Sequence, residues 1–168
     1  MRRRPILFAA LASVALVLGT WAGPVASASA DAAPVSLGIS TTGAHRGDTV
    51  TITTVYTNPE AVPVVFSYMA VVPWVPTLTG NVDYDFTGCT GDIAWCAVVE
   101  DGRAAAVQHT VEIAPGATRS ASFTFRIADE SPCGPTVGIA FRTYNYRESS
   151  AGAVDGFSST VVAAGVSC

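Results

Sequence analysis

Alternation of apolar and polar residues along the chain predicts a series of short β-strands. Residues 35–39 alternate between branched apolar and small residues, and this period of two is typical of a half-buried strand. Residues 122–127 alternate in the same way, so Phe123, Phe125 and Ile127 should point inward.

Further strands are separated by turn-forming residues. Residues 48–57 predict a long strand rich in Thr and Val, and a slip of phase at Thr53 and Thr54 predicts a bulge. Residues 62–72 are nearly continuously apolar, which predicts a strand buried on both faces, or one whose polar face is too short to see. The pattern predicts a turn at 43–47 and more strands at 80–91, 92–99 and 109–113. Seven to nine strands without a convincing helix predict an all-β fold, an antiparallel β-sandwich.

The end of the chain predicts a β-hairpin whose open end is closed by two cysteines. Residues 136–146 and 157–166 are rich in strand formers, and residues 147–156 are a run of turn formers. Opposed residues in an antiparallel pair have a constant sum of residue numbers. Placing Cys133 opposite Cys168 therefore puts the tip at Ser150 and Ala151. A disulfide there would stabilise the domain by about 4 kcal/mol on the chain-entropy estimate.

Residues 1–30 have the pattern of a secretory signal peptide. Three arginines precede a largely apolar run at 6–22, and Ala28-Ser29-Ala30 offers a small-x-small cleavage site. We expect cleavage after Ala30, with the twin-arginine route as the alternative means of export. A single domain then covers 31–168. The apolar run is too short for a stable membrane anchor, so we expect an extracellular protein, released or held non-covalently at the cell wall.

Four cysteines in a chain with an export signal predict two disulfides. Three pairings are possible. We favour Cys89 with Cys96 and Cys133 with Cys168, because each pair then closes a local turn. A structural zinc site usually has cysteines two to four residues apart, and this spacing does not match it. We expect neither a metal nor a cofactor.

The charge balance argues against two kinds of partner. Cleavage removes Arg2, Arg3 and Arg4 and no acidic residue, which lowers the formal charge from −4 to −7. Nucleic acid and anionic membrane surfaces are therefore unfavourable partners. The chain has no lysine, which excludes Schiff-base catalysis by lysine and the Lys-Asn isopeptide cross-links of many Gram-positive pilus domains.

Several short motifs follow one another along the chain: Gly47-Asp48-Thr49-Val50-Thr51, Asn58, Pro73, Cys89 with Cys96, and Ala114-Pro115-Gly116-Ala117-Thr118. In this order and spacing they resemble the conserved-repeat domain of unknown function found in bacterial surface and secreted proteins. The resemblance covers residues 34–128 and implies an immunoglobulin-like sandwich with a spacer, adhesive or wall-associated role and no catalysis. Two features depart from the family. It usually has an acidic residue shortly before the proline, where this chain has Ala70-Val71-Val72, and it usually occurs in tandem.

Several short motifs each have a functional and a structural interpretation. Arg46-Gly47-Asp48 is the tripeptide that integrins recognise, but glycine and aspartate there also suit a turn that enters a strand. A Ser/His/Asp hydrolase would need His45 or His109 beside a serine, and no serine lies in a Gly-x-Ser-x-Gly context. We expect His109 to begin a strand and to lie at the surface or at an edge.

The acidic residues around the first cysteine pair could hold calcium. Asp83 and Asp85 share one strand face, and Asp92 lies in the loop between Cys89 and Cys96. The same spacing is typical of a solvated strand face. Paired carboxylates for glycoside hydrolysis have no better support, because so small a chain leaves little room for a substrate cleft.

The closing hairpin offers the best candidate binding surface. If Ile139 and Phe141 face the core, Arg142, Tyr144 and Tyr146 share the opposite face, and we place Arg126 on a neighbouring strand. Tyrosine and arginine are enriched where proteins bind partners, so a protein or a cell-wall glycan is the expected ligand. The structural alternative is that the tyrosines only cover the hairpin end.

Three classes of function follow. The leading one is a secreted, non-catalytic binding or structural domain at the surface of a Gram-positive, actinobacterial cell. The second is a small-ligand carrier, because the chain also resembles the enediyne-antibiotic apoproteins, which are secreted, acidic and sandwich-folded with two local disulfides. Their cysteine spacing is not reproduced at Cys133 and Cys168. A small secreted hydrolase is the third.

Overall fold

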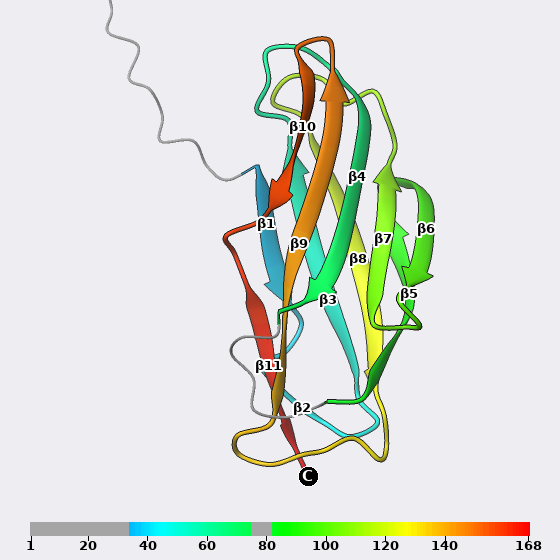
Figure 1. Cartoon of the computed structure of the whole chain (residues 1–168), viewed down its shortest axis with the longest axis vertical. Coiled ribbons are helices and arrows are strands. Elements are labelled where there is room, and N and C mark those ends of the chain that lie inside the picture. Colours follow the sequence, from blue (N-terminus) through cyan, green and yellow to red (C-terminus); the bar gives the residue numbers. More distant parts are fainter. Residues whose placement is uncertain (1–33, 75–81) are drawn as a thin grey trace, which may run out of the picture. The chain divides into compact units, whose positions relative to one another are not determined.

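The computed structural model describes residues 34–74 and 82–168, and these residues form eleven strands and no helix (Figure 1). Within them, no helix is long and apolar enough to cross a membrane. The strands are β1 (Val35–Ile39), β2 (Gly43–His45), β3 (Thr49–Thr57), β4 (Val64–Pro73), β5 (Tyr84–Gly91), β6 (Ile93–Val99), β7 (Ala104–His109), β8 (Thr118–Ile127), β9 (Gly138–Ser149), β10 (Gly152–Phe157) and β11 (Val162–Ser167).

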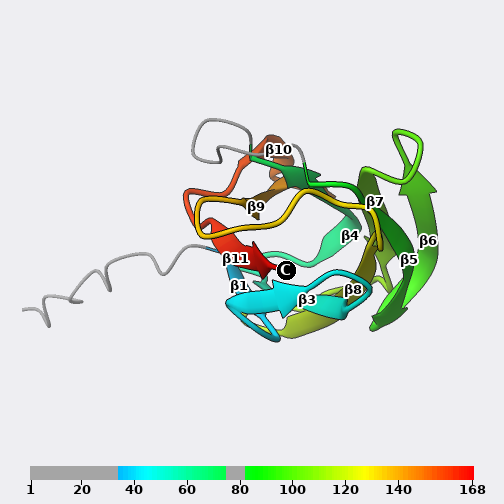
Figure 2. The same cartoon turned by 90° about the horizontal axis from the view of Figure 1, so that it is seen from below.

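The strands form two sheets that pack face to face (Figure 2). The smaller sheet has the order β1-β3-β8-β5, and the larger has the order β2-β11-β9-β4-β7-β6. β10 pairs with the second half of β9, beside the position that β11 occupies along the first half. All pairs are antiparallel except β2 with β11. The predicted antiparallel β-sandwich is confirmed, with β2, β7 and β10 as strands that the sequence pattern missed.

The inward residues of both sheets form one core. Phe123, Phe125 and Ile127 of β8 are fully buried, as predicted, and they meet Met69 of β4 and Phe141 of β9. Tyr84 and Phe86 add their rings to those of Phe125 and Phe141, with centroids 5.0–6.0 Å apart and mostly edge to face. Aromatic pairs in this geometry stabilise a core beyond the area that they bury.

The predicted bulge at Thr53 and Thr54 is wrong. β3 pairs with β8 without interruption from Thr49 opposite Arg126 to Thr57 opposite Thr118. Thr54 is buried, and its hydroxyl donates a hydrogen bond to the carbonyl oxygen of Ala121 at 3.3 Å. A threonine satisfied in this way occupies a core position, so the apparent slip of phase is a polar residue on the inner face.

The predicted strand at 109–113 is also wrong. β7 ends at His109, and beyond it Ile113 makes an isolated bridge with Val64. The strand itself begins with Ala104, which opens a run of small apolar residues with no visible alternation. The predicted turn at 43–47 is likewise shorter, because residues 43–45 form β2 along β11.

The closing hairpin has the predicted tip and a different register below it. Gly152 pairs with Ser149, so the tip is Ser150 and Ala151. The turn formers around this tip nevertheless lie in strands, because residues 147–149 also pair with β4 on their other side. Ser158 still pairs with Thr143, through its backbone N–H and its hydroxyl. Beyond Ser158 the register shifts by two residues, and Val162 lies opposite Phe141.

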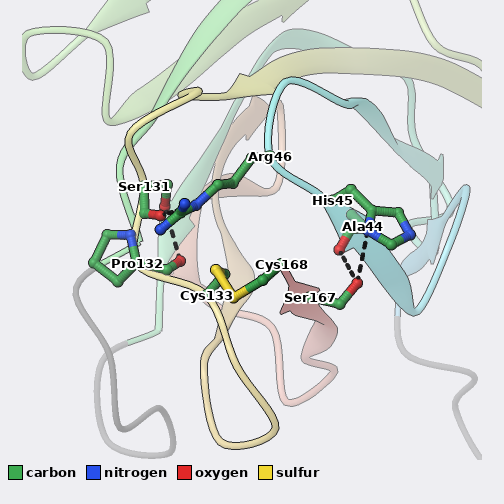
Figure 3. Close-up of a disulfide and its surroundings, with 8 residues drawn as sticks. All are labelled: Ala44, His45, Arg46, Ser131, Pro132, Cys133, Ser167 and Cys168. Carbon is green, nitrogen blue, oxygen red and sulfur yellow. Dashed lines mark hydrogen bonds between the residues drawn. A yellow bond between two sulfur atoms is a disulfide. The ribbon is translucent and has the colours of Figure 1, made fainter.

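Both predicted disulfides are present. Cys89 and Cys96, with Cα atoms 6.0 Å apart, link β5 of the smaller sheet to β6 of the larger. Cys133 and Cys168, with Cα atoms 5.2 Å apart, link the segment before β9 to the residue after β11 (Figure 3). The cysteines are therefore bridged in pairs, and the described residues contain no cluster of three or more metal-ligating side chains.

Candidate binding surface

Aromatic side chains and one arginine gather on the outer face of the larger sheet, over β4, β9 and β10. Because Phe141 and Thr143 of β9 point into the core, their neighbours along the strand point outward. The strand register places Tyr68 of β4 opposite Tyr146, and Phe157 of β10 opposite Tyr144. We call this surface the aromatic face, and its residues are Phe66, Tyr68, Trp74, Arg142, Tyr144, Tyr146 and Phe157.

The rings of the aromatic face contact one another across the strands. Tyr146 meets Phe66 with centroids 5.9 Å apart, and Tyr144 meets Tyr68 at 6.4 Å and Phe157 at 5.3 Å. All three pairs are edge to face, an arrangement that aromatic rings prefer. Phe157 is 53% exposed, so the face presents apolar ring surface to solvent.

Arg142 lies at one end of this face and contacts two rings. Its guanidinium carbon is 4.2 Å from the ring centroid of Trp74 and 3.7 Å from that of Phe157. Trp74 follows β4 directly, and its backbone N–H donates to the carbonyl oxygen of Ala140 at 2.8 Å. Cation–π contacts of this kind contribute roughly 0.5–2 kcal/mol, depending on exposure. The Nε atom of Arg142 is buried and has no acceptor within the described residues.

The two tyrosine hydroxyls of β9 donate hydrogen bonds to carboxylates on the same face. Tyr144 donates to Oδ2 of Asp155 at 3.0 Å, and Tyr146 donates to Oε1 of Glu148. Each hydrogen bond, more than any other influence, raises the pKa of its tyrosine, because the carboxylate favours the protonated phenol. Both phenols are therefore neutral donors at physiological pH.

The structure brings together three of the four predicted site residues. Arg142, Tyr144 and Tyr146 share the aromatic face, as the period of two indicated. The placement of Arg126 is wrong, because β8 belongs to the smaller sheet, where Arg126 donates to Asp129 at 2.8 Å. Sequence reasoning missed Trp74 and Phe157, whose contacts with Arg142 depend on cross-strand register. The outward position of Tyr68 could have been predicted from the sequence, because Tyr68 lies between Ser67 and Met69, which are both buried.

The Arg46-Gly47-Asp48 tripeptide is part of a tight turn. Gly47 has a positive φ of 80°, which favours glycine, and the Asp48 carboxylate accepts a hydrogen bond from the backbone of His45 at 2.8 Å. Arg46 points to the carbonyl oxygen of Ser131 and donates to it, beside the Cys133–Cys168 link (Figure 3). All three residues therefore have structural partners within the described chain.

The two histidines lie in different settings. The Nδ1 atom of His45 is 3.0 Å from the hydroxyl of Ser167, which also donates to the carbonyl oxygen of Ala44 at 3.1 Å (Figure 3). This pair joins β2 to β11, and no carboxylate of the described residues contacts the His45 ring. A serine and a histidine are thus adjacent, but the third member of a Ser/His/Asp arrangement is not among the described residues.

The surface position expected for His109 is wrong, because its side chain is fully buried at the end of β7. Its ring stacks on Tyr56 with centroids 6.2 Å apart and an interplanar angle of 23°. Burial lowers the pKa of His109, although the backbone of Asp92 and, to a smaller extent, its charge oppose this effect. The imidazole is therefore neutral near pH 7.

Asp83 and Asp92, two of the three aspartates considered for calcium, have separate partners. Asp83 forms an ion pair with Arg103 at 3.7 Å. Oδ2 of Asp92 accepts hydrogen bonds from the backbone and the hydroxyl of Ser120 at 3.0 and 3.2 Å, which lower the pKa of Asp92. The described carboxylates do not converge on a common point.

A cavity of about 310 Å³ lies between the start of β1 and the inner side of the β9–β10 pair. Its walls include Val35, Val154, Asn145 and Arg147. Arg147 donates through Nε to Oε1 of Glu60 at 2.8 Å, and both side chains are mostly buried, at 16% and 14% exposure. The neighbouring Ser149 hydroxyl and the Arg147 guanidinium lower the pKa of Glu60.

Comparisons with known proteins identify the fold of the chain, and they do not assign its sequence to a family. No protein-family model and no curated protein matches the sequence. The full-length major pilin SpaD from Corynebacterium diphtheriae aligns with 77% of this chain and 34% of its own length, at 14% identity and a TM-score of 0.54. The N-terminal domain of the Streptococcus gordonii adhesin Sgo0707 aligns with 79% of this chain and 32% of its own, at 10% identity and a TM-score of 0.52.

A third solved structure is a cohesin module from a Clostridium perfringens family 33 glycoside hydrolase. It aligns with 81% of this chain and 98% of its own length, at 9% identity and a TM-score of 0.49. This chain spans about a third of the length of the pilin and adhesin structures. Identities this low establish the fold alone. The chain is an all-β, immunoglobulin-like sandwich, and its fold is similar to folds found in the pilin and the adhesin.

Proposed function

We propose that this chain is an exported, non-catalytic immunoglobulin-like domain that binds a partner at or near the bacterial cell surface through its aromatic face. The observation that carries the proposal is the gathering of Arg142, Trp74, Phe157, Tyr144 and Tyr146 on one outer sheet face. Tryptophan, tyrosine and arginine are the residues that most often dominate binding energy at interfaces.

The proposed location rests on two further observations. The sequence of residues 1–30 has the pattern of a secretory signal, and the two disulfides suit an oxidising compartment outside the cytoplasm. The fold likeness to a pilin and an adhesin agrees with a surface role. The motif resemblance to the conserved-repeat domain points the same way.

The test is a pull-down from culture medium and cell-wall fractions with the mature chain as bait. The double variant Tyr144→Ser, Tyr146→Ser should retain its fold, measured by circular dichroism and thermal melting, because both hydroxyls lie on an outer face. Capture of the partner should fall by at least about tenfold, as for loss of aromatic anchors. Trp95→Ser is the matched control, since Trp95 is 45% exposed on β6. Undiminished capture by the folded double variant would refute the proposal.

A small-ligand carrier is the second candidate, and the cavity beneath β10 is the observation that favours it. Its volume of about 310 Å³ is at the lower end of the range for ligand sites. Asn145 and Arg147 would supply the polar contacts. Val154→Trp should fill this cavity and abolish uptake of a small apolar dye, while the aromatic face stays intact. Equal dye uptake by the variant would reject the carrier function.

A further inference from the structure

Arg142 differs from the other arginines of the described chain in having no hydrogen-bond acceptor. Arg46 and Arg119 donate to backbone carbonyls, and Arg103, Arg126 and Arg147 pair with carboxylates. Arg142 instead packs against the rings of Trp74 and Phe157, and its buried Nε has no partner in the described residues. Among the described residues, this guanidinium has no carboxylate partner.

The geometry of this cation selects a class of ligand. The rings of Trp74 and Phe157 lie 4.2 and 3.7 Å from the guanidinium carbon, and the terminal N–H groups donate to no acceptor among the described residues. Planar N–H donors match the paired oxygens of a carboxylate, and they also match those of a phosphate. Arg142 is therefore prepared to receive a carboxylate from a ligand that lies on the aromatic face.

The rest of the face indicates what carries that carboxylate. Successive outward residues of β9 are about 6.6 Å apart, so Tyr144 and Tyr146 extend from Arg142 as a row of apolar ring surface. Beside this row the carboxylates of Asp155 and Glu148 accept hydrogen bonds from the tyrosine hydroxyls and have lone pairs left for other hydroxyl donors. Pyranose rings present apolar C–H faces and many hydroxyl donors.

The same carboxylates disfavour an acidic peptide or a densely charged polyanion. Glu148 lies about 20 Å from Arg142 along β9, so the face is positive at one end and negative along the rest. A ligand that suits this pattern has one carboxylate at the Arg142 end and neutral, hydroxyl-rich units over the tyrosines. We propose that the aromatic face binds a glycan in which uronic acids alternate with neutral sugars, with Arg142 holding the uronate carboxylate.

This inference rests on the proposed function, because it assigns a ligand class to the same surface. The probe is hyaluronan, a polymer of alternating glucuronate and N-acetylglucosamine, together with its carboxyl-reduced, neutral derivative. Polyglutamate is the acidic-peptide comparison. Affinity of the mature chain is measured by retardation in native gels that contain each polymer, at about 0.15 M salt.

We expect the wild type to bind hyaluronan and Arg142→Gln to bind it at least about tenfold more weakly. Arg126→Gln is the matched control and should bind as the wild type does, because Arg126 lies on the other sheet. The carboxyl-reduced polymer should bind weakly and equally to the wild type and to Arg142→Gln. The comparison of hyaluronan with the carboxyl-reduced polymer can be made on the wild type alone. It therefore tests the role of the carboxylate even if the Arg142 variant folds poorly.

Three results would overturn the inference. The first is that the wild type does not bind hyaluronan at millimolar disaccharide concentration. The second is that the wild type binds the carboxyl-reduced polymer as tightly as hyaluronan. The third is that polyglutamate binds more tightly than hyaluronan and that this binding depends on Arg142. If the tyrosine double variant loses its captured wall partner while Arg142→Gln and carboxyl reduction change nothing, the binding face remains and the carboxylate inference fails. If neither variant changes capture, the proposed function fails as well.

Discussion

Replacement of His109 by Phe should make the domain less sensitive to acid without unfolding it. The imidazole is fully buried and stacks on Tyr56. The backbone of Asp92 lies close enough to raise the pKa of the ring, but neither ring nitrogen has a partner in hydrogen-bonding geometry within the described residues, so we treat both nitrogens as unpaired. Phenylalanine keeps the ring and removes two unpaired polar atoms. An unpaired buried polar group costs about 1–3 kcal/mol, and a slightly larger ring in a packed site costs a similar amount. At pH 7.5 the free energies of unfolding should therefore agree within about 2 kcal/mol.

The pH dependence gives the sharper test. Burial depresses the pKa of His109 in the folded state, so the unfolded chain takes up the proton first as the pH falls. The contribution to stability is fully present above the unfolded pKa of about 6.5 and is lost below it, by at most about 1.4 kcal/mol per pH unit. Between pH 6.5 and 5, His109→Phe should gain up to about 2 kcal/mol relative to the wild type.

Urea unfolding followed by tryptophan fluorescence at pH 7.5, 6.5 and 5 measures both quantities. His45→Asn is the control, because it removes the other histidine and leaves the His109 contribution in place. An unchanged pH slope in His109→Phe would contradict the argument. A loss above about 3 kcal/mol at pH 7.5 would also contradict it, and would indicate that a ring N–H donates a hydrogen bond, for example to the backbone of Asp92.

Three further predictions concern the disulfide, the buried ion pair and export. Replacing Cys133 and Cys168 by Ala should lower the free energy of unfolding by about 2–5 kcal/mol in urea titrations, whereas a loss below 1 would mean that the link contributes little. Glu60→Gln should cost about 1–3 kcal/mol at pH 7, between the values for exposed and buried pairs. Because the folded pKa of Glu60 is lowered, that cost should disappear as the pH falls through it, and a cost that persists in acid would refute the assignment. Mass spectrometry of the secreted protein should find Asp31 at its amino terminus, and retention of Met1 would refute export by cleavage.

The sequence predicted the parts of the fold that depend on local alternation. The inward positions of β1, β5 and β8 follow a period of two, and constant residue sums in a hairpin located the tip at Ser150 and Ala151. Sequence analysis missed strand β7, because its alanines are buried on both faces and show no alternation of apolar and polar residues. Sequence analysis also missed the two-residue shift in register beyond Ser158, because the shift depends on which residues of β9 pair with β11.

Sequence analysis predicted the site residues that lie on one strand, β9, and missed those that other strands contribute. Arg142, Tyr144 and Tyr146 lie on one face because alternation within β9 is local. Arg126 is on the opposite side of the sandwich because its strand pairs with β3 and β5. Local sequence patterns do not show which of the two sheets a strand joins when its partner strands are distant in the sequence. The contacts of Trp74 and Phe157 with Arg142 are cross-strand contacts of the same kind, so they became visible only with the register.

The link between Cys133 and Cys168 also decides how this domain responds to tension. A pull applied at Pro34 and Cys168 passes from Cys168 to Cys133 through the covalent bond, and the loop between them carries no load. That loop spans a sequence separation of 35 and contains β9, β10 and β11. About 120 Å of extended chain is thereby withheld from stretching. Arg142, Tyr144, Tyr146 and Phe157 all lie within this shielded loop, so most of the aromatic face would keep its shape while the remaining strands bear the force.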